Sequence, residues 1–131
     1  MVRRLDNHLG PIYEEAFRDH LRWRANTGQL GEALVSPDIV AIGPWWCGDG
    51  QDRIAAVALA EPAQTRVPVL VGEAKWTQRV HGGRVTAQLA RKASALTDDI
   101  DTLCYAVCAR EEVTRAEPNM MSLTAADMFN S

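Results

Sequence analysis

The sequence predicts a single α/β domain over residues 1–131, with a central mixed β-sheet flanked by helices. Apolar, β-branched runs of strand length alternate with segments that have the 3.6-residue period of amphipathic helices. The chain is 47% hydrophobic and 24% charged, which is typical of a globular protein, and its 131 residues suffice for one core. We expect the order α-β-β-β-α-β, followed by a short C-terminal strand and helix.

Two segments have the apolar stripe of an amphipathic helix. The first covers residues 10–24, where Pro11 suits the first helical turn because its missing N–H is harmless there. The second opens after Gly82-Gly83 and covers residues 83–97. The apolar stripes are formed by Ile12, Tyr13, Ala16, Phe17 and Leu21 in the first helix, and by Val85, Leu89, Ala93 and Leu96 in the second.

The expected strands fall into two groups. Three apolar runs, 39–46, 53–59 and 67–76, follow one another closely and are best joined by antiparallel hairpins, with a turn at 47–50. Strand character returns at 100–109 and again at 120–123, before a final helix or turn for which Thr124 is a plausible N-cap. A crossover through the second helix would make the strands at 67–76 and 103–109 parallel.

The most informative segment is the run from Val67 to Trp76. Its apolar first half, Val67 to Val71, is typical of a strand buried on both faces, and Glu73 and Lys75 follow it. Side chains two apart on a strand point to the same side, so a carboxylate and an ammonium are expected to leave a buried strand together. Such charges are costly unless they are paired, metal-bound or functional.

Charge and cysteine content narrow the class of protein. A net charge of −3 does not favour tight nonspecific DNA binding by this domain alone. The three cysteines, Cys47, Cys104 and Cys108, are expected to be reduced thiols, with zinc binding the minority interpretation. No apolar run approaches the ~20 residues of a membrane span, and the N-terminal residues do not resemble a signal peptide. We therefore expect a cytosolic protein with no membrane partner.

The order of elements, with Glu-X-Lys on the third strand, resembles the core of the PD-(D/E)XK nuclease superfamily and implies a restriction-endonuclease-like fold. More narrowly, the chain is similar to the nuclease-like domain at the C-terminus of archaeal and bacterial P-loop ATPases. The resemblance implies a P-loop ATPase domain or subunit as partner, whereas this chain has no Gly-X4-Gly-Lys-Ser/Thr motif and hence no nucleotide site of that kind. The matching stretches are Gly10–Phe17, Ile42–Trp46, Ala56–Leu59, Leu70–Trp76 and Leu89–Ala93.

By this resemblance, Glu73 is a ligand of Mg²⁺, Lys75 orients the attacking water, and Glu14 is the supporting carboxylate of the first helix. Carboxylate oxygens hold Mg²⁺, which acidifies bound water and neutralises charge on the phosphate. Glu14 has a plainer interpretation as the i,i+4 partner of Arg18 on a solvated face. Glu73 and Lys75 can likewise be interpreted as a mutual ion pair at the end of a sheet.

The second strand departs from the family pattern. Aligning its apolar run places Ala55 where the superfamily has a metal-binding aspartate, and Arg53 where an acid is usual. Asp52 lies three residues earlier, which on a regular strand is the opposite face, although a β-bulge would re-aim it. Asp38 is the other acid that would restore the missing ligand.

Further residues have both a functional and a structural interpretation. Gln88 and Lys92 flank the apolar stripe of the second helix, where they either lean toward Glu73 as supporting groups or form its solvated edge. Trp45 and Trp46 are expected to pack in the core or at a sheet edge, since a base-stacking platform usually has basic neighbours.

Two functions compete on these grounds. The first is a nuclease-fold module with a degenerate metal site that acts through protein or DNA contacts and is coupled to a P-loop ATPase. The second is an active Mg²⁺-dependent DNA endonuclease in which Asp52 or Asp38 replaces the missing ligand. A third interpretation is a structural part of a longer chain. The missing aspartate favours the first function.

Overall fold

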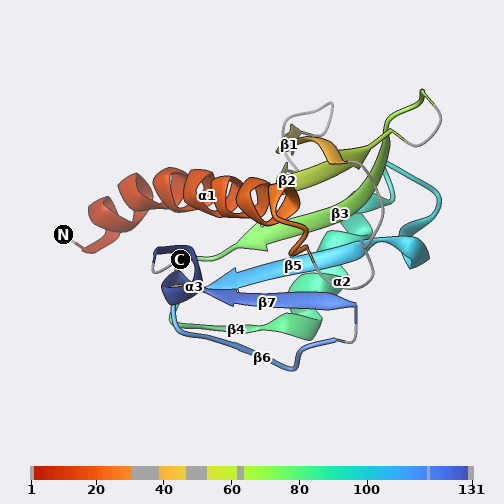
Figure 1. The fold of residues 1–131 in the computed structure, drawn as a ribbon. Helices are drawn as coiled ribbons and strands as arrows, with labels where there is room; N and C mark the ends of the chain where they lie inside the picture. Colours follow the sequence, from red (N-terminus) through yellow and green to blue (C-terminus); the bar gives the residue numbers. More distant parts are fainter. Residues whose placement is uncertain (1, 31–38, 47–52, 62–63, 118, 130–131) are drawn as a thin grey trace.

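The central element is a mixed five-stranded sheet of order β1-β2-β3-β5-β7 (Figure 1). The computed structural model describes residues 2–30, 39–46, 53–61, 64–117 and 119–129. β1, β2 and β3 pair antiparallel, and β3, β5 and β7 pair parallel, so the predicted mixed sheet and its crossover are confirmed. The strands are β1 (Ile39–Trp46), β2 (Arg53–Ala60), β3 (Val67–Ala74), β5 (Cys104–Ala109) and β7 (Met120–Thr124).

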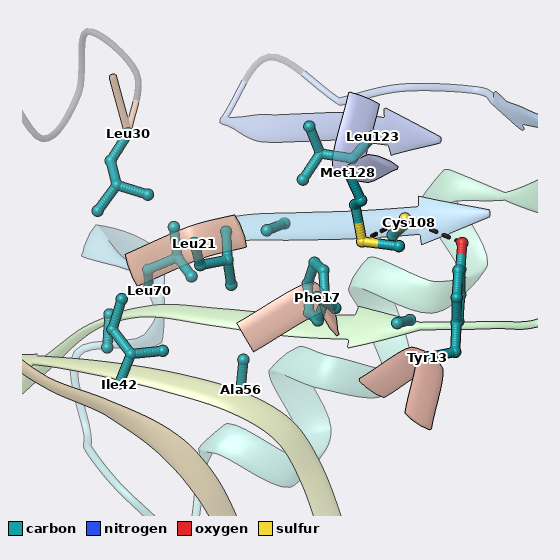
Figure 2. Packing of buried hydrophobic residues seen from close by; sticks show 13 residues of the cluster. Tyr13, Phe17, Leu21, Leu30, Ile42, Ala56, Leu70, Cys108, Leu123 and Met128 are labelled. Atoms are coloured by element: carbon teal, nitrogen blue, oxygen red, sulfur yellow. Dashed lines mark hydrogen bonds between the residues drawn. The ribbon is translucent and has the colours of Figure 1, made fainter. Parts of the chain in front are cut away.

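Helix α1 (Val2–Asn26) covers one face of this sheet (Figure 1). Tyr13, Phe17 and Leu21 project from α1 into a cluster that Leu70 of β3 and residues of β2, β5 and β7 complete (Figure 2). The predicted start at residue 10 is wrong, because the helix begins at Val2 and Pro11 lies inside it. Pro11 suits a helix start because proline has no backbone N–H to donate to the helical hydrogen bonds. Here the helix nevertheless continues through it.

Helix α2 (Gly82–Ala93) covers the opposite face of the sheet. Val85, Leu89 and Ala93 are buried, as the stripe predicts. His81 caps the helix by accepting a hydrogen bond from the Arg84 backbone N–H over 3.1 Å. The predicted end at residue 97 is too late, since the helix ends at Ala93 and a hydrogen-bonded turn follows.

The strand ends also required correction. β3 ends at Ala74 instead of Trp76. Its residues are fully buried only from Leu70 onward, and Val67, which was predicted to be buried, is exposed. Residues Ile100–Thr102 form a short 3-10 helix, η2, before β5. Two three-residue strands, β4 (Arg79–His81) and β6 (Glu112–Thr114), pair in a small parallel sheet that was not predicted because each is too short to show a period.

The C-terminal segment follows the prediction closely. Thr124 directly precedes helix α3 (Ala125–Phe129), and its backbone N–H and hydroxyl both donate to the Asp127 carboxylate.

Cys104 and Cys108 are free thiols, as expected, whereas Cys47 and the predicted turn at 47–50 lie outside the described residues. None of the described helices is long and apolar enough to cross a bilayer.

Candidate functional site

A pocket of about 330 Å³ lies where β2 and β3 separate. The last β2–β3 pair is Ala56 with Gly72, whereas β3 continues to pair with β5 as far as Ala74 and Cys108. Beyond Gly72 the side of β3 that faces β2 is therefore open to side chains from both helices. We call this space the Glu73 pocket; it is lined by Tyr13, Glu14, Arg53, Glu73, Ala74, Lys75, Trp76 and Lys92.

A β-bulge in β2 determines which residue reaches the pocket. Gly43 pairs with Val57 and Trp45 pairs with Ile54, so one residue of β1, Pro44, lies opposite two residues of β2. The extra residue changes the alternation of side chains: Ile54 packs on the α2 side with Val57. Pro44 was the available signal for this bulge, because proline cannot donate a hydrogen bond to the neighbouring strand.

Because of the bulge, Arg53 and not Ala55 lines the pocket. Ala55 is fully buried, and its carbonyl accepts a 2.8 Å hydrogen bond from Arg18 Nη1. The alignment that placed Ala55 at the metal-binding position is therefore not supported by the geometry. Asp52 and Asp38, the acids proposed to restore the ligand, lie outside the described residues.

Glu14 is buried on α1 and forms a close ion pair with Arg53 Nη2. Its other oxygen lies 4.0 Å from Arg18 Nη1, so the predicted i,i+4 partner is present. The prediction that this pair lies on a solvated face is wrong, since the side chains of both Glu14 and Arg18 are about nine-tenths buried. Arg53 comes from a different element and is the closer partner, which sequence spacing alone does not reveal.

Glu73 is 8% exposed and faces Lys92 of α2, whose Nζ lies 4.0 Å from Glu73 Oε2. The same Lys92 ammonium donates a 3.0 Å hydrogen bond to the Arg53 carbonyl of β2. Burial raises the pKa of Glu73 above the ordinary glutamate value, and the positive charges of Lys75 and Lys92 oppose this only in part. Lys92 therefore leans toward Glu73, whereas Gln88 is exposed and is not among the residues that line the pocket.

Lys75 also lines the pocket but does not pair with Glu73. Its backbone N–H donates to the Cys108 carbonyl over 2.9 Å, which continues the β3–β5 ladder by one residue past the strand. Within the described part of the chain, its exposed ammonium has no ion pair within 4.0 Å. Glu73 and Lys75 are thus not in direct contact, although the Lys75 charge is the one that most opposes the rise in the Glu73 pKa, and the exposed Lys75 ammonium is accessible to a ligand.

Aromatic residues close the α1 side of the pocket. Trp76 meets Tyr13 edge to face, with ring centroids 4.7 Å apart, and the Arg110 guanidinium lies 5.6 Å from the Trp76 ring centroid. The Tyr13 hydroxyl is 3.1 Å from Cys108 Sγ, and burial raises the pKa of Tyr13 strongly (Figure 2). Tyr13 is therefore a neutral phenol that holds Trp76 in place. Tyr13, Trp76 and Arg53 were not predicted as site residues.

The charges of the pocket favour an anion over a metal ion. Among the described residues that line the pocket, three are cations, Arg53, Lys75 and Lys92, and two are carboxylates, Glu14 and Glu73. Among the described residues, no three His, Cys, Asp or Glu side chains are grouped so that they could hold a metal ion. A phosphate group would find three positively charged donors in this space.

We expect Glu73→Gln to stabilise the protein at pH 7. The folded protein holds the Glu73 proton more tightly than the unfolded chain, so its stability is greatest below the ordinary glutamate pKa and falls as pH rises through the raised folded-state pKa. The unfolding midpoint of the variant should exceed that of the parent at pH 7, and the difference should vanish near pH 4. Exposed Glu112→Gln is the control; an equal gain there, or none for Glu73→Gln, contradicts the expectation.

The chain matches the model of a known protein family. A model of the family DUF234, described as archaeal and bacterial proteins of unknown function, matches residues 1–92. No curated protein matches the chain. No solved structure matches it. The matched part includes all the described residues that line the Glu73 pocket.

Proposed function

The chain belongs to this archaeal and bacterial family of unknown function, and from its pocket we propose a nuclease-fold module that binds the phosphates of nucleic acid without hydrolysing them. One observation carries the proposal: protein cations already face both pocket carboxylates. Arg53 pairs with Glu14, and Lys92 lies beside Glu73. In the nuclease superfamily that the sequence resembles, a metal ion would be expected beside such carboxylates.

The physical argument concerns competition for the same oxygens. Mg²⁺ requires near-octahedral oxygen coordination and is reluctant to lose water, so it gains little from carboxylates already engaged by fixed cations. A divalent cation would also be repelled by Arg53, Lys75 and Lys92. A phosphate diester is attracted by the same three groups, and the exposed Lys75 ammonium is accessible to it.

We propose that the module acts with a P-loop ATPase, present either as a neighbouring domain or as a separate subunit. The sequence resemblance alone supports this coupling. The coding sequence next to this one is the direct test, since an adjacent ATPase gene or domain is expected. The unfavourable net charge of −3 fits a module whose partner contributes additional affinity for DNA.

The second candidate is an active Mg²⁺-dependent DNA endonuclease that uses Glu73 and Lys75, with Asp52 or Asp38 as the additional ligand. The observation in its favour is that Glu14, Glu73 and Lys75 line one pocket, as the resemblance implies. Hydrolysis would require Arg53 and Lys92 to release the carboxylates to the metal.

Incubation with DNA distinguishes the two functions. We expect the purified protein with Mg²⁺ or Mn²⁺ to leave supercoiled and single-stranded DNA intact, because both carboxylates among the described pocket residues, Glu14 and Glu73, face protein cations. Gel electrophoresis over extended incubation is the measurement. Metal-dependent cutting that Glu73→Gln abolishes would establish the endonuclease instead.

Arg53→Asp tests the role of the cation directly. The change removes the guanidinium beside Glu14 and adds a third carboxylate to the pocket, so we expect affinity for Mg²⁺ or Mn²⁺ to rise by about tenfold or more, ~1.4 kcal/mol. Isothermal titration calorimetry measures this, with circular dichroism to confirm folding. Arg79→Asp makes the same charge change at an exposed site outside the pocket and should not alter metal affinity. Equal gains in both variants would count against the proposal.

A further inference from the structure

We infer that the ligand of the pocket is single-stranded nucleic acid, whose bases stack on Trp46 and Trp76. This inference rests on the proposed function, since it adds base contacts to the phosphate contacts of the Glu73 pocket. Trp76 lines the pocket, Trp46 lies under the guanidinium of the pocket residue Arg53, and Arg110 lies over the Trp76 ring. An aromatic surface with a neighbouring cation is the arrangement that proteins use to bind single strands.

Trp46 forms the outer side of this surface. It is the last residue of β1, is 57% exposed, and pairs across the strands with Arg53. The Arg53 guanidinium lies 5.3 Å from the Trp46 ring centroid and also lines the pocket. The sequence argument against base stacking by Trp46 was that a stacking platform usually has basic neighbours. Arg53 is such a neighbour, so that argument does not hold for Trp46. A large, exposed indole beside a pocket cation is suited to a base.

Trp76 forms the inner side. It lines the pocket itself, two residues beyond the end of β3, and the edge contact with Tyr13 fixes its ring. Tyr13 is in turn held by Cys108 of β5, so the indole is supported by buried groups on two elements. A preformed platform of this kind loses little conformational entropy when a base stacks on it.

The two indoles lie on the same side of the sheet. Trp76 contacts Tyr13 of α1, and the guanidinium over Trp46 pairs with Glu14 of α1.

Arg53 connects the two indoles, because its guanidinium lies over Trp46 and also lines the pocket that Trp76 lines, and the phosphates of a short single strand would pass there. Arg53 and Lys75 both line the pocket and carry positive charge there. In a duplex, each base is already stacked and paired, so it cannot offer its face to either indole. The arrangement therefore selects single strands over duplexes.

The test compares four fluorescein-labelled ligands by fluorescence anisotropy at low ionic strength, using the whole chain. These are oligothymidylate, oligouridylate, an abasic deoxyribose-phosphate chain of equal length, and a duplex. We expect oligothymidylate or oligouridylate to bind about tenfold or more tightly than both the abasic chain and the duplex. The stronger of the two identifies the polymer as DNA or RNA.

Variants separate stacking from charge. Trp46→Ala should weaken single-strand binding about tenfold and leave abasic binding unchanged, whereas Trp46→Phe should retain most of the affinity. Lys75→Gln should weaken all four ligands. Trp23 is the matched control, because it is an exposed tryptophan of α1 outside the pocket, and Trp23→Ala should have no effect.

The outcomes of these measurements distinguish the base-stacking inference from the proposed function of phosphate binding. Equal binding of the single strand, abasic chain and duplex, all weakened by Lys75→Gln, would overturn the stacking inference and leave phosphate binding intact. Equal loss in Trp46→Ala and Trp23→Ala would also overturn it. No binding of any of the four ligands would overturn the proposed function itself.

Discussion

Replacing Glu14 by glutamine should destabilise the fold by about 3 kcal/mol, as measured by urea denaturation at pH 7. Glu14 is the buried counterion of Arg53, and its second oxygen lies 4.0 Å from the buried Arg18 guanidinium. Arg18 Nε already has no hydrogen-bond partner in the described structure. Removing the carboxylate leaves two guanidiniums close together with one fewer compensating charge, which is costly away from water.

Two further measurements sharpen this prediction. Glu112→Gln breaks an exposed pair with Arg79 at 3.2 Å and should cost at most about 1 kcal/mol. Glu14→Gln should also tighten nucleic-acid binding, because the Glu73 pocket becomes more positive while its cations remain. A variant as stable as the parent would show that Arg53 and Arg18 are compensated by groups other than Glu14.

Gly72→Val should destabilise the protein by about 2–3 kcal/mol, because a side chain at this position has no room. A Cβ on Gly72 would lie 2.8 Å from Phe17 Cζ and 3.1 Å from the Ala106 carbonyl oxygen. Phe17 is fully buried and cannot turn away, and the carbonyl belongs to the neighbouring strand β5. The glycine before Glu73 is thus required by the packing of α1 on the sheet, whatever the chemistry of the pocket.

A double-mutant cycle isolates the cause. Gly43→Ala is the control, because a Cβ on Gly43 of β1 meets nothing within 4 Å, and its effect should stay within about 0.5 kcal/mol. The milder pair Gly72→Ala and Phe17→Leu should be coupled, with the double variant less destabilised than the sum of the single ones, since leucine leaves space where the phenyl ring ends. Additive effects would place the cost in the strand backbone instead.

The sequence predicted the fold well where a period extends over several turns or residues. The stripe containing Phe17 and Leu21 placed α1 on the sheet, and the crossover rule made β3 and β5 parallel. The start of α1 was not predictable in this way, because Pro11 has the local chemistry of a helix start but lies within the helix. β4 and β6 pair over three residues each and carry no periodic signal.

The candidate site was predictable in part. Glu73 was found because a charge in a buried strand is unusual, and Glu14 because of the resemblance. Arg53 was missed as a pocket residue because its orientation depends on one extra residue in β2, which shifts every side chain before it to the other face. This bulge arises from the way β2 pairs with β1. The sequence of either strand taken alone therefore gives only a weak signal for it.

The parallel pairing of β3 with β5 has a consequence for biosynthesis. The described residues that line the Glu73 pocket all precede residue 93, yet β3 is held in place by β5, which the ribosome makes afterwards. Long-range parallel pairing forms slowly, and nascent chains fold as units. The Glu73 pocket can therefore form fully only once translation has passed residue 109 and β5 is available to pair with β3.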